Sequence, residues 1–290
     1  MNGFLLVDKP KGITSFDVVK IARKALGVRK IGHAGNLDPH ATGLLILGIG
    51  RATRFIPFIM DLDKEYIATI KLGILTDTLD VTGEVIDRKP VGNFTEEELK
   101  NVLRNFLGEI EQVPPSYSAI RVKGQRLYDL AREGVFVTPK PKRVTIYNLE
   151  ILEKRDDEID LRVVCSKGTY IRALARDIGE KLGTYGIVKE LRRTKIGPFS
   201  INEAIKPEDI KSDSVIPIDQ GLRHLPSIVI NDRAAWHFRN GNSVGLNGIV
   251  KRIGNPRTFQ HVKVYDPSGK FLGIGLLKWD GVYPKRVLPE

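Results

Sequence analysis

The segment from Gly32 to Gly43, GHAGNLDPHATG, holds the side chain of this chain that is best placed for chemistry. Its three glycines allow unusual backbone angles and the close approach of another molecule. Asp38 lies between a leucine and a proline, and Pro39 holds it toward extended geometry. An isolated Asp-Pro pair usually forms a turn or caps a helix. A rigid loop can also present an aspartate carboxylate as a nucleophile, and the segment alone leaves both interpretations open.

The sequence lacks the motifs of other common catalytic sites. There is no GxxxxGK[ST] phosphate loop, and the pairs Gly48-Ile49-Gly50 and Gly273-Ile274-Gly275 lack the third glycine of a dinucleotide-binding loop. The five histidines and Cys165 do not have metal-site spacing, and no GxSxG motif occurs. We therefore expect a site that uses no metal and no cofactor.

Charge and composition restrict the class of partner. The chain has 290 residues, with 46 Lys and Arg against 35 Asp and Glu, and a net charge of +11. This excess favours a polyanionic partner. A 41% apolar content excludes disorder as the main state. With one cysteine, no apolar run of the roughly 18 residues that a membrane helix needs and no signal peptide, we expect a cytoplasmic protein without a membrane partner.

Short elements must position the glycine-rich loop from both sides. Gly3 to Val7 is an apolar run that predicts a strand, and Ser15 is predicted as the N-cap of a helix that Gly27 ends. The apolar stretch from Leu44 to Ile49 leaves the loop and is the next core segment. The loop is thus expected to lie between buried elements.

Patterns further along predict a mixed fold. Apolar residues alternate from Tyr66 to Leu72, which predicts a strand over residues 64–73. Thr95 and Glu98 form a capping box for a helix that is expected to end at Gly108. The remaining predictions are strands near 144–153 and 159–165, a helix over about 171–182 and an extended basic segment over 186–197. The class is therefore α+β, with a largely antiparallel mixed sheet flanked by helices.

Two segments are expected to extend this body. Residues 121–143 are rich in cations and poor in large apolar side chains, which predicts an exposed excursion with one short helix around Arg126 to Arg132. Near Pro226 the composition changes, so we place the domain boundary between residues 1–227 and 228–290. The second part has several short β-type runs, which predict a small β-barrel. It holds ten Lys and Arg against four Asp and Glu, so it carries more than half of the excess charge.

The glycine-rich loop resembles the signature G-H-x-G-x-L-D-P-x-A-T-G of the TruB family of pseudouridine synthases. Ala34 stands where many relatives carry threonine. Further blocks of the family follow in the same order, at residues 64–66, 72–83, 112–119, 168–174 and 191–199. Because ordered blocks over residues 3 to 200 are far more specific than one motif, the chain is identified as a member of this family. The part from residue 228 resembles a PUA domain, a small RNA-binding β-barrel.

The resemblance implies a set of site residues. It makes Asp38 the catalytic aspartate, Tyr66 the tyrosine that stacks on the target base, and Arg172 the arginine that pairs with the aspartate. Tyr170 and Leu191 match residues that pack the base pocket. The other residues that we expect to contact the substrate are His33, Lys64, Arg126, Arg192 and Arg193. Asn36 and His40 fall at variable positions of the motif and receive no role.

The implied reaction is the conversion of uridine 55 in the TΨC loop of tRNA to pseudouridine, without a cofactor. The base must first leave its stack, which costs a few kcal/mol. A neighbouring Arg172 would keep the Asp38 carboxylate ionised despite burial. Whether Asp38 attacks C6, attacks C1′ or promotes an elimination stays open. The resemblance also implies that residues 121–143 grip the T-arm and that the PUA-like part lies near the acceptor end, with no obligate protein partner.

Two other functions stay open at this point. The chain could be a guide-RNA-dependent relative that works inside a multi-protein particle, although such relatives generally lack the long excursion at 121–143. It could also be a tRNA-binding or tRNA-folding factor without catalysis. Asp38, Tyr66 and Arg172 together disfavour a purely binding role.

Overall fold

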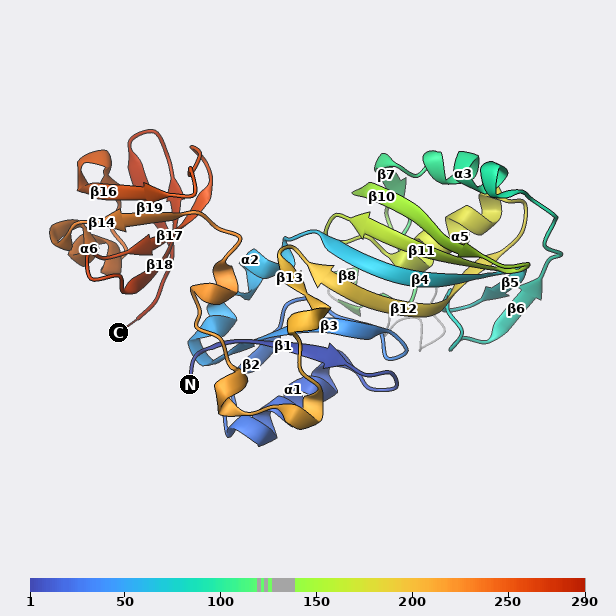
Figure 1. The fold of residues 1–290 in the computed structure, drawn as a ribbon, viewed down its shortest axis with the longest axis horizontal. Coiled ribbons are helices and arrows are strands. Elements are labelled where there is room, and N and C mark those ends of the chain that lie inside the picture. Colours follow the sequence, from blue (N-terminus) through green and yellow to red (C-terminus); the bar gives the residue numbers. More distant parts are fainter. Residues whose placement is uncertain (119–120, 123–124, 127–138, 290) are drawn as a thin grey trace.

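The computed structural model describes residues 1–118, 121–122, 125–126 and 139–289 (Figure 1). Its main body is a mixed sheet with the strand order β1-β3-β12-β4-β11-β10-β7, in which β2 also pairs with β3 and β13 with β12. The strands are β1 (Gly3–Lys9), β2 (Ile31–His33), β3 (Thr42–Ile49), β4 (Lys64–Leu72), β7 (Gly108–Gln112), β10 (Lys142–Lys154), β11 (Glu158–Cys165), β12 (Gly186–Ile196) and β13 (Phe199–Ser200). Within the described residues β3 and β12 are its parallel pair, so the predicted, largely antiparallel α+β class is confirmed.

Helices cover this sheet in two groups. Figure 1 shows α3 (Glu96–Arg104) and α5 (Ile171–Lys181) over the end of the sheet that carries β4, β10 and β11. The helix α1 (Ser15–Leu26) lies beside β1 and β2 instead. Each group closes an apolar core of its own, one with Leu99, Leu174 and Leu161 and one with Val18 and Leu45. None of the helices within the described ranges is both long and apolar enough to span a membrane.

The predicted N-cap of α1 is wrong by one residue. The cap is Thr14, whose hydroxyl accepts from the amide of Asp17 at 3.0 Å, while the Asp17 carboxylate accepts from the Thr14 amide. Ser15 is buried, and its Oγ accepts from the amide of Leu37 at 2.9 Å. Both residue types cap helices well, so only the tertiary contact distinguishes them. The predicted stop at Gly27 is confirmed, since Gly27 has a left-handed φ of 65°.

The capping box of α3 is confirmed, but its predicted end is not. Thr95 and Glu98 bond each other's backbone amides as expected. The helix ends at Arg104, because the side-chain amide of Asn105 donates to the carbonyls of Asn101 and Val102 in the last turn. Gly108 has instead a φ of +86° and begins β7.

The C-terminal part forms a second sheet, at the left of Figure 1, with the order β15-β19-β18-β17-β14-β16. Its strands are β14 (Ser227–Ile230), β15 (Val244–Gly245), β16 (Ile249–Ile253), β17 (His261–Tyr265), β18 (Phe271–Leu277) and β19 (Gly281–Val287), and the helix α6 (Asp232–Arg239) covers it. Phe238 of α6 and Val264 of β17 are fully buried in its core. This curled sheet fits the small β-barrel that the sequence predicts.

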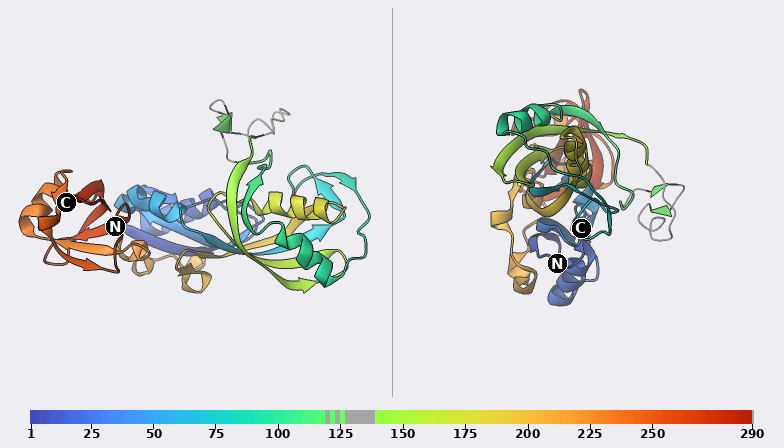
Figure 2. Two further views of the ribbon diagram at one scale, coloured as in Figure 1. Left: turned by 90° about the horizontal axis from the view of Figure 1, so that it is seen from above. Right: turned by 90° about the vertical axis from the view of Figure 1, so that its right-hand side faces the viewer.

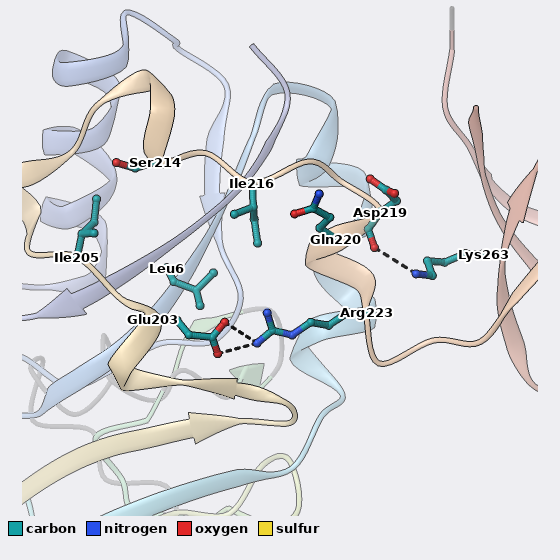
Figure 3. Close-up of a pocket in the computed structure, with 9 residues that line it drawn as sticks. All are labelled: Leu6, Glu203, Ile205, Ser214, Ile216, Asp219, Gln220, Arg223 and Lys263. Carbon is teal, nitrogen blue, oxygen red and sulfur yellow. Dashed lines mark hydrogen bonds and ion pairs between the residues drawn. The ribbon is translucent and has the colours of Figure 1, made fainter. Parts of the chain in front are cut away.

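The two parts pack on each other through apolar and polar contacts. Ile274 of β18 is fully buried in one core with Phe55 and Ile196 of the main body. Beside it, a cavity lies where the connecting segment 201–225 passes β1, and Lys263 of the C-terminal sheet reaches its rim (Figure 3). In this cavity Arg223 pairs with Glu203 at 2.6 Å, and Lys263 Nζ donates to the Asp219 carbonyl at 3.4 Å. Because residues of both parts line this cavity and bond each other there, we regard it as part of the interface between the two parts.

Two hairpin-like pairs stand outside the sheets. One is β5 (Ile74–Thr76) with β6 (Val85–Arg88). The other is β8 (Arg121–Val122) with β9 (Gln125–Arg126), which lies away from the main sheet in Figure 2. The helix predicted for Arg126 to Arg132 lies outside the described residues, apart from Arg126 itself, which is in β9. The last two residues of the predicted excursion, Lys142 and Arg143, belong to β10.

Candidate active site

The segment between β2 and β3 holds Asp38 at the edge of a buried core. Leu37 is 4% exposed and is fixed by Ser15 of α1. On the other side the carbonyl of Pro39 accepts from the Gly12 amide at 2.8 Å and from Lys9 Nζ at 3.3 Å. The side chain of Asp38 between these anchors is 31% exposed. The carboxylate is therefore held on a fixed backbone and stays accessible to a ligand.

Gly43 ends this loop at a position that tolerates no side chain. Its φ is +106°, and an added Cβ would lie 2.2 Å from the carbonyl oxygen of Arg193. This contact lets β3 approach β12 closely enough to form the parallel pair. The glycine thus fixes the end of the loop on the neighbouring strand.

Arg172 is the cation that faces Asp38. It lies in the first turn of α5, is 6% exposed, and places Nε 3.0 Å from Asp38 Oδ2. Its Nη1 and Nη2 donate to the carbonyls of Thr78 and Tyr117, each at 2.8 Å. Because two fixed carbonyls set the plane of the guanidinium, Nε is directed at the carboxylate. The buried guanidinium and the Asp38 carboxylate therefore form an ion pair of fixed geometry.

A second buried carboxylate, which the sequence analysis did not assign, completes the cluster. Asp80 is 3% exposed, and its Oδ1 accepts from Thr78 Oγ1 at 2.8 Å and from the Thr82 amide at 2.9 Å. Its Oδ2 lies 3.6 Å from Arg172 Nη1 and 3.5 Å from His40 Nδ1. The signal for Asp80 in the sequence is its place among threonine hydroxyls in the block 72–83.

His40 also lies in this cluster, although the sequence analysis gave it no role. It is 4% exposed, and burial lowers the pKa of its imidazole, opposed by the nearby Asp80 and Asp38 carboxylates. Nothing in the sequence singles out this histidine, because Asp80, which lies 3.5 Å from its Nδ1, belongs to a distant segment of the chain.

The same residues meet the geometric requirement for a cation. One ligand atom from each of Asp38, His40 and Asp80 lies within 4.8 Å of the others. The guanidinium of Arg172 already lies between the two carboxylates, at 3.0 Å and 3.6 Å. This charge compensation favours an ion-pair network over a metal site.

Tyr66 supplies an aromatic face beside the cluster. It lies on β4, is half-buried, and packs against the core that contains Leu191 of β12. Burial raises the pKa of the Tyr66 phenol, and the neighbouring Arg193 guanidinium opposes this rise. The side chain is therefore a neutral phenol at neutral pH. Together, these residues present a carboxylate, a fixed cation and an aromatic ring on adjacent elements.

Comparison with known proteins identifies this arrangement. Residues 23–171 match the model of the TruB family pseudouridylate synthase N-terminal domain. Residues 172–224 match the C-terminal domain of tRNA pseudouridylate synthase B, and residues 226–288 match the C-terminal part of pseudouridine synthase II TruB. The chain belongs to the TruB family of pseudouridine synthases.

Individual relatives agree with this membership. The chain is 42% identical over 279 residues to tRNA pseudouridine synthase B of Clostridium tetani, covering 95% of both chains. It is 43% identical over 295 residues to tRNA pseudouridine synthase B of Aquifex aeolicus, covering 99% of this chain and all of the relative. A solved Cbf5-Nop10-Gar1 complex gives a TM-score of 0.78 at 26% identity, over 99% of this chain and 85% of that one. The predicted family and enzyme class, a pseudouridine synthase, are confirmed.

Two of the TruB-type residues that we expected to contact the substrate are buried instead. Arg193 is 1% exposed, and its three nitrogens donate to the carbonyls of Leu44, Asn36 and Gly35 at 2.7, 3.2 and 3.3 Å. Lys64 is 8% exposed, and its ammonium donates to the carbonyls of Met60 and Leu62. Neither cation is free to reach a phosphate in this structure, because backbone carbonyls of the main body take up its donors. Arg193 instead holds the loop that carries Asp38.

The remaining predicted residues of the TruB-type site lie in different surroundings. Arg192 is about two-fifths exposed and pairs with Asp8, and Tyr170 is fixed by the Gln112 side chain, which bonds both its amide and its carbonyl. Leu191 is buried in the core cluster against which Tyr66 packs. His33 is half-buried on β2, where burial lowers its pKa. The side chain of Arg126 lies outside the described residues.

Proposed function

We propose that this TruB-family chain converts uridine 55 in the TΨC loop of tRNA to pseudouridine, as a stand-alone enzyme. The observation that carries this proposal is the partly exposed Asp38 carboxylate 3.0 Å from the buried guanidinium of Arg172. The relatives that share about two-fifths of its residues over their whole length are each named tRNA pseudouridine synthase B. A tRNA substrate also fits the net charge of +11 and a cytoplasmic location.

The proposed reaction needs only the groups in the cluster. The N1–C1′ bond of the uridine breaks, the ring turns, and a C5–C1′ bond forms. C5 loses its proton and N1 gains one, so the reaction is an isomerisation. Asp38 supplies the nucleophile or base, and the fixed guanidinium of Arg172 orients its carboxylate. The ring of Tyr66 offers a stacking surface for the flipped uracil, and Leu191 belongs to the core cluster against which that ring packs.

Substrate contacts outside the cluster are part of the proposal. We assign the basic residues 121–143 to the T-arm and the C-terminal sheet to the acceptor end. Arg192 of β12 is a further candidate for a phosphate contact, because its guanidinium is partly exposed and Asp8 holds it in place. His33 and Tyr170 border the loop and the start of α5, where the flipped nucleotide would enter.

The test is pseudouridine formation on an unmodified tRNA transcript, with a chelator and without guide RNA. Wild-type protein is expected to form pseudouridine at position 55. Asp38→Asn is expected to lose turnover while its tRNA affinity stays within roughly tenfold, about 1.4 kcal/mol. Asp61→Asn is the matched control, because Asp61 is an exposed carboxylate that pairs with Lys167. Substantial turnover by Asp38→Asn would overturn the role of Asp38.

One observation favours a second candidate function. The fold similarity to a chain of an H/ACA RNP bound to a substrate RNA extends over 98% of this chain, which fits a subunit of an RNA–protein particle. The same assay separates the two functions. Tight tRNA binding without product from the wild-type chain would favour the guided subunit or a binding factor, and adding candidate partners would then distinguish these.

A further inference from the structure

Two large aromatic rings lie exposed on the C-terminal sheet, outside its core. Phe259, in the turn between β16 and β17, is 57% exposed, and Trp279, in the turn between β18 and β19, is 70% exposed. Their ring centroids are 4.9 Å apart at an angle of 89°. The edge-to-face pair leaves ring faces open to solvent, although burial would stabilise rings of this size. We name this pair the aromatic platform.

The backbone holds the platform in a fixed geometry. Phe259 has a φ of 61°, a strained conformation for a bulky residue. Its amide donates to the Leu277 carbonyl at 2.7 Å, and the Leu277 amide donates to the Gln260 carbonyl at 3.0 Å. The side chain of Gln260 accepts from the Arg257 amide at 2.9 Å. These bonds join the two turns, so the rings need little ordering when they bind a partner.

Two cations are close neighbours of the platform in the chain. Arg257 and Lys278 are each within two residues of one of its rings, and Lys278 Nζ lies 4.2 Å from the ring centre of Tyr283. Asp280 lies in the same turn, where its carboxylate accepts from the Tyr283 hydroxyl. The segment 228–290 has ten Lys and Arg against four Asp and Glu. Exposed rings next to cations match a partner with both planar bases and phosphates, as single-stranded nucleic acid has.

We propose that Phe259 and Trp279 stack on an unpaired nucleobase of the substrate RNA, with Arg257 and Lys278 on the adjacent phosphates. The choice of tRNA rests on the proposed function, which assigns the C-terminal sheet to the acceptor end, where the unpaired 3′ nucleotides offer such bases. We favour an unpaired base over a second protein chain, because the platform has cations as chain neighbours and lies in a part with ten Lys and Arg against four Asp and Glu.

Tryptophan fluorescence provides a direct test, because the chain has two tryptophans. In Trp236→Phe, all tryptophan emission comes from Trp279. A short single-stranded oligonucleotide is expected to quench this emission, and a blunt duplex of the same length is not. In Trp279→Phe the remaining Trp236 should show little quenching; it is 62% exposed, and its ring meets His237 edge-on with the centroids 5.0 Å apart. Equal quenching of both variants would overturn the proposal.

Binding to tRNA tests the same platform in the full chain. Trp279→Ala is expected to weaken tRNA binding about tenfold, within the range for loss of one stacked base. Phe259→Asn removes the other ring and tolerates the left-handed backbone, so it should weaken binding without unfolding the turn. Trp236→Ala is the matched control. With a tRNA that lacks its unpaired 3′ nucleotides, wild type and Trp279→Ala should bind equally.

Other outcomes separate this proposal from its rivals. Quenching by anionic lipid vesicles but not by the oligonucleotide, or concentration-dependent self-association that Trp279→Ala abolishes, would replace it with a membrane or a dimer surface. If the wild-type chain forms no pseudouridine but the oligonucleotide still quenches Trp279, the proposed function fails while the platform stands. If pseudouridine forms and Trp279→Ala binds tRNA as wild type does, the platform alone is wrong.

Discussion

Arg192 and Arg193 are neighbours on β12 with opposite surroundings. Arg192 is partly exposed and pairs with Asp8, whereas Arg193 is buried and donates to three carbonyls of the segment from Gly35 to Leu44. Successive strand residues point to opposite faces of a sheet. Arg192 therefore lies at the surface, whereas Arg193, the next residue, holds the loop that carries Asp38.

Substitution of the two arginines should separate these roles. Arg193→Met leaves buried carbonyls without donors and is expected to lower the free energy of unfolding by about 3 kcal/mol. Arg192→Gln should leave stability nearly unchanged and reduce the salt slope of tRNA binding by about one. Urea unfolding and binding at several salt concentrations measure both effects. The reverse result, with Arg192→Gln destabilised and Arg193→Met stable, would contradict these positions.

The buried Lys64 predicts a pH dependence of stability. Burial lowers its pKa from 10.5 to about 8. Between these values the unfolded chain binds more protons than the folded chain, so the contribution of Lys64 to stability rises with pH across this window. The free energy of unfolding of wild type, relative to Lys64→Met, should increase from pH 8 to pH 10 and stay constant below pH 7. Denaturant unfolding at each pH measures it, and a constant difference would show that Lys64 is not buried as a cation.

At the scale of elements, α5 places Arg172 and is itself fixed by a contact between two glycines. A Cβ added at Gly179 would lie 2.3 Å from the amide nitrogen of Gly186 on β12. This close approach sets the distance between the helix and the strand, and with it the position of Arg172 relative to Asp38.

The substitution Gly179→Ala therefore has two opposing effects on stability: it raises the helix propensity, and it introduces a clash with β12. Alanine favours a helix over glycine by about 1 kcal/mol, but a backbone clash of this kind costs about 1–3 kcal/mol or more. We expect net destabilisation, and a larger loss of turnover than of tRNA affinity, because Arg172 moves. Gly92→Ala, whose Cβ would meet no atom within 4 Å, is the control. A more stable Gly179→Ala variant would show that the helix can shift freely.

At the scale of the whole molecule, the C-terminal sheet is part of the core of the main body. Ile274 shares a buried cluster with Phe55, Ile196 and Phe199. The Phe58 ring also meets His261 with their centroids 5.1 Å apart. The interface between the two parts thus has its own apolar core. The C-terminal sheet therefore contributes to the stability of the chain as well as to its net charge.

Removal of residues 228–290 should have two effects for this reason. Binding to tRNA should weaken with a smaller salt slope, because ten cations are lost. The melting temperature of the remainder should also fall, because the cluster around Phe55 becomes exposed. Ile274→Ala in the full chain isolates the second effect, with an expected loss of about 2–5 kcal/mol and an unchanged salt slope. An unchanged melting temperature in the truncated chain would show that the interface between the two parts adds no stability.

The sequence by itself determined the local features of this protein. The glycine-rich loop with Asp38, the capping box of Thr95 and Glu98, the alternation on β4 and the basic C-terminal part all depend on neighbours in the chain. Ordered motifs also led to the family and to the pair of Asp38 with Arg172, which the structure places 3.0 Å apart.

Only the tertiary structure decided which polar residues are buried and what they contact. Thr14 rather than Ser15 caps α1 because Ser15 bonds Leu37, and Asp80 and His40 join the site because distant segments meet there. The burial of Arg193 also depends on a long-range contact, with carbonyls more than a hundred positions away. Residue type and local spacing do not encode such contacts, because burial and hydrogen-bond partners are set by packing between elements far apart in the chain.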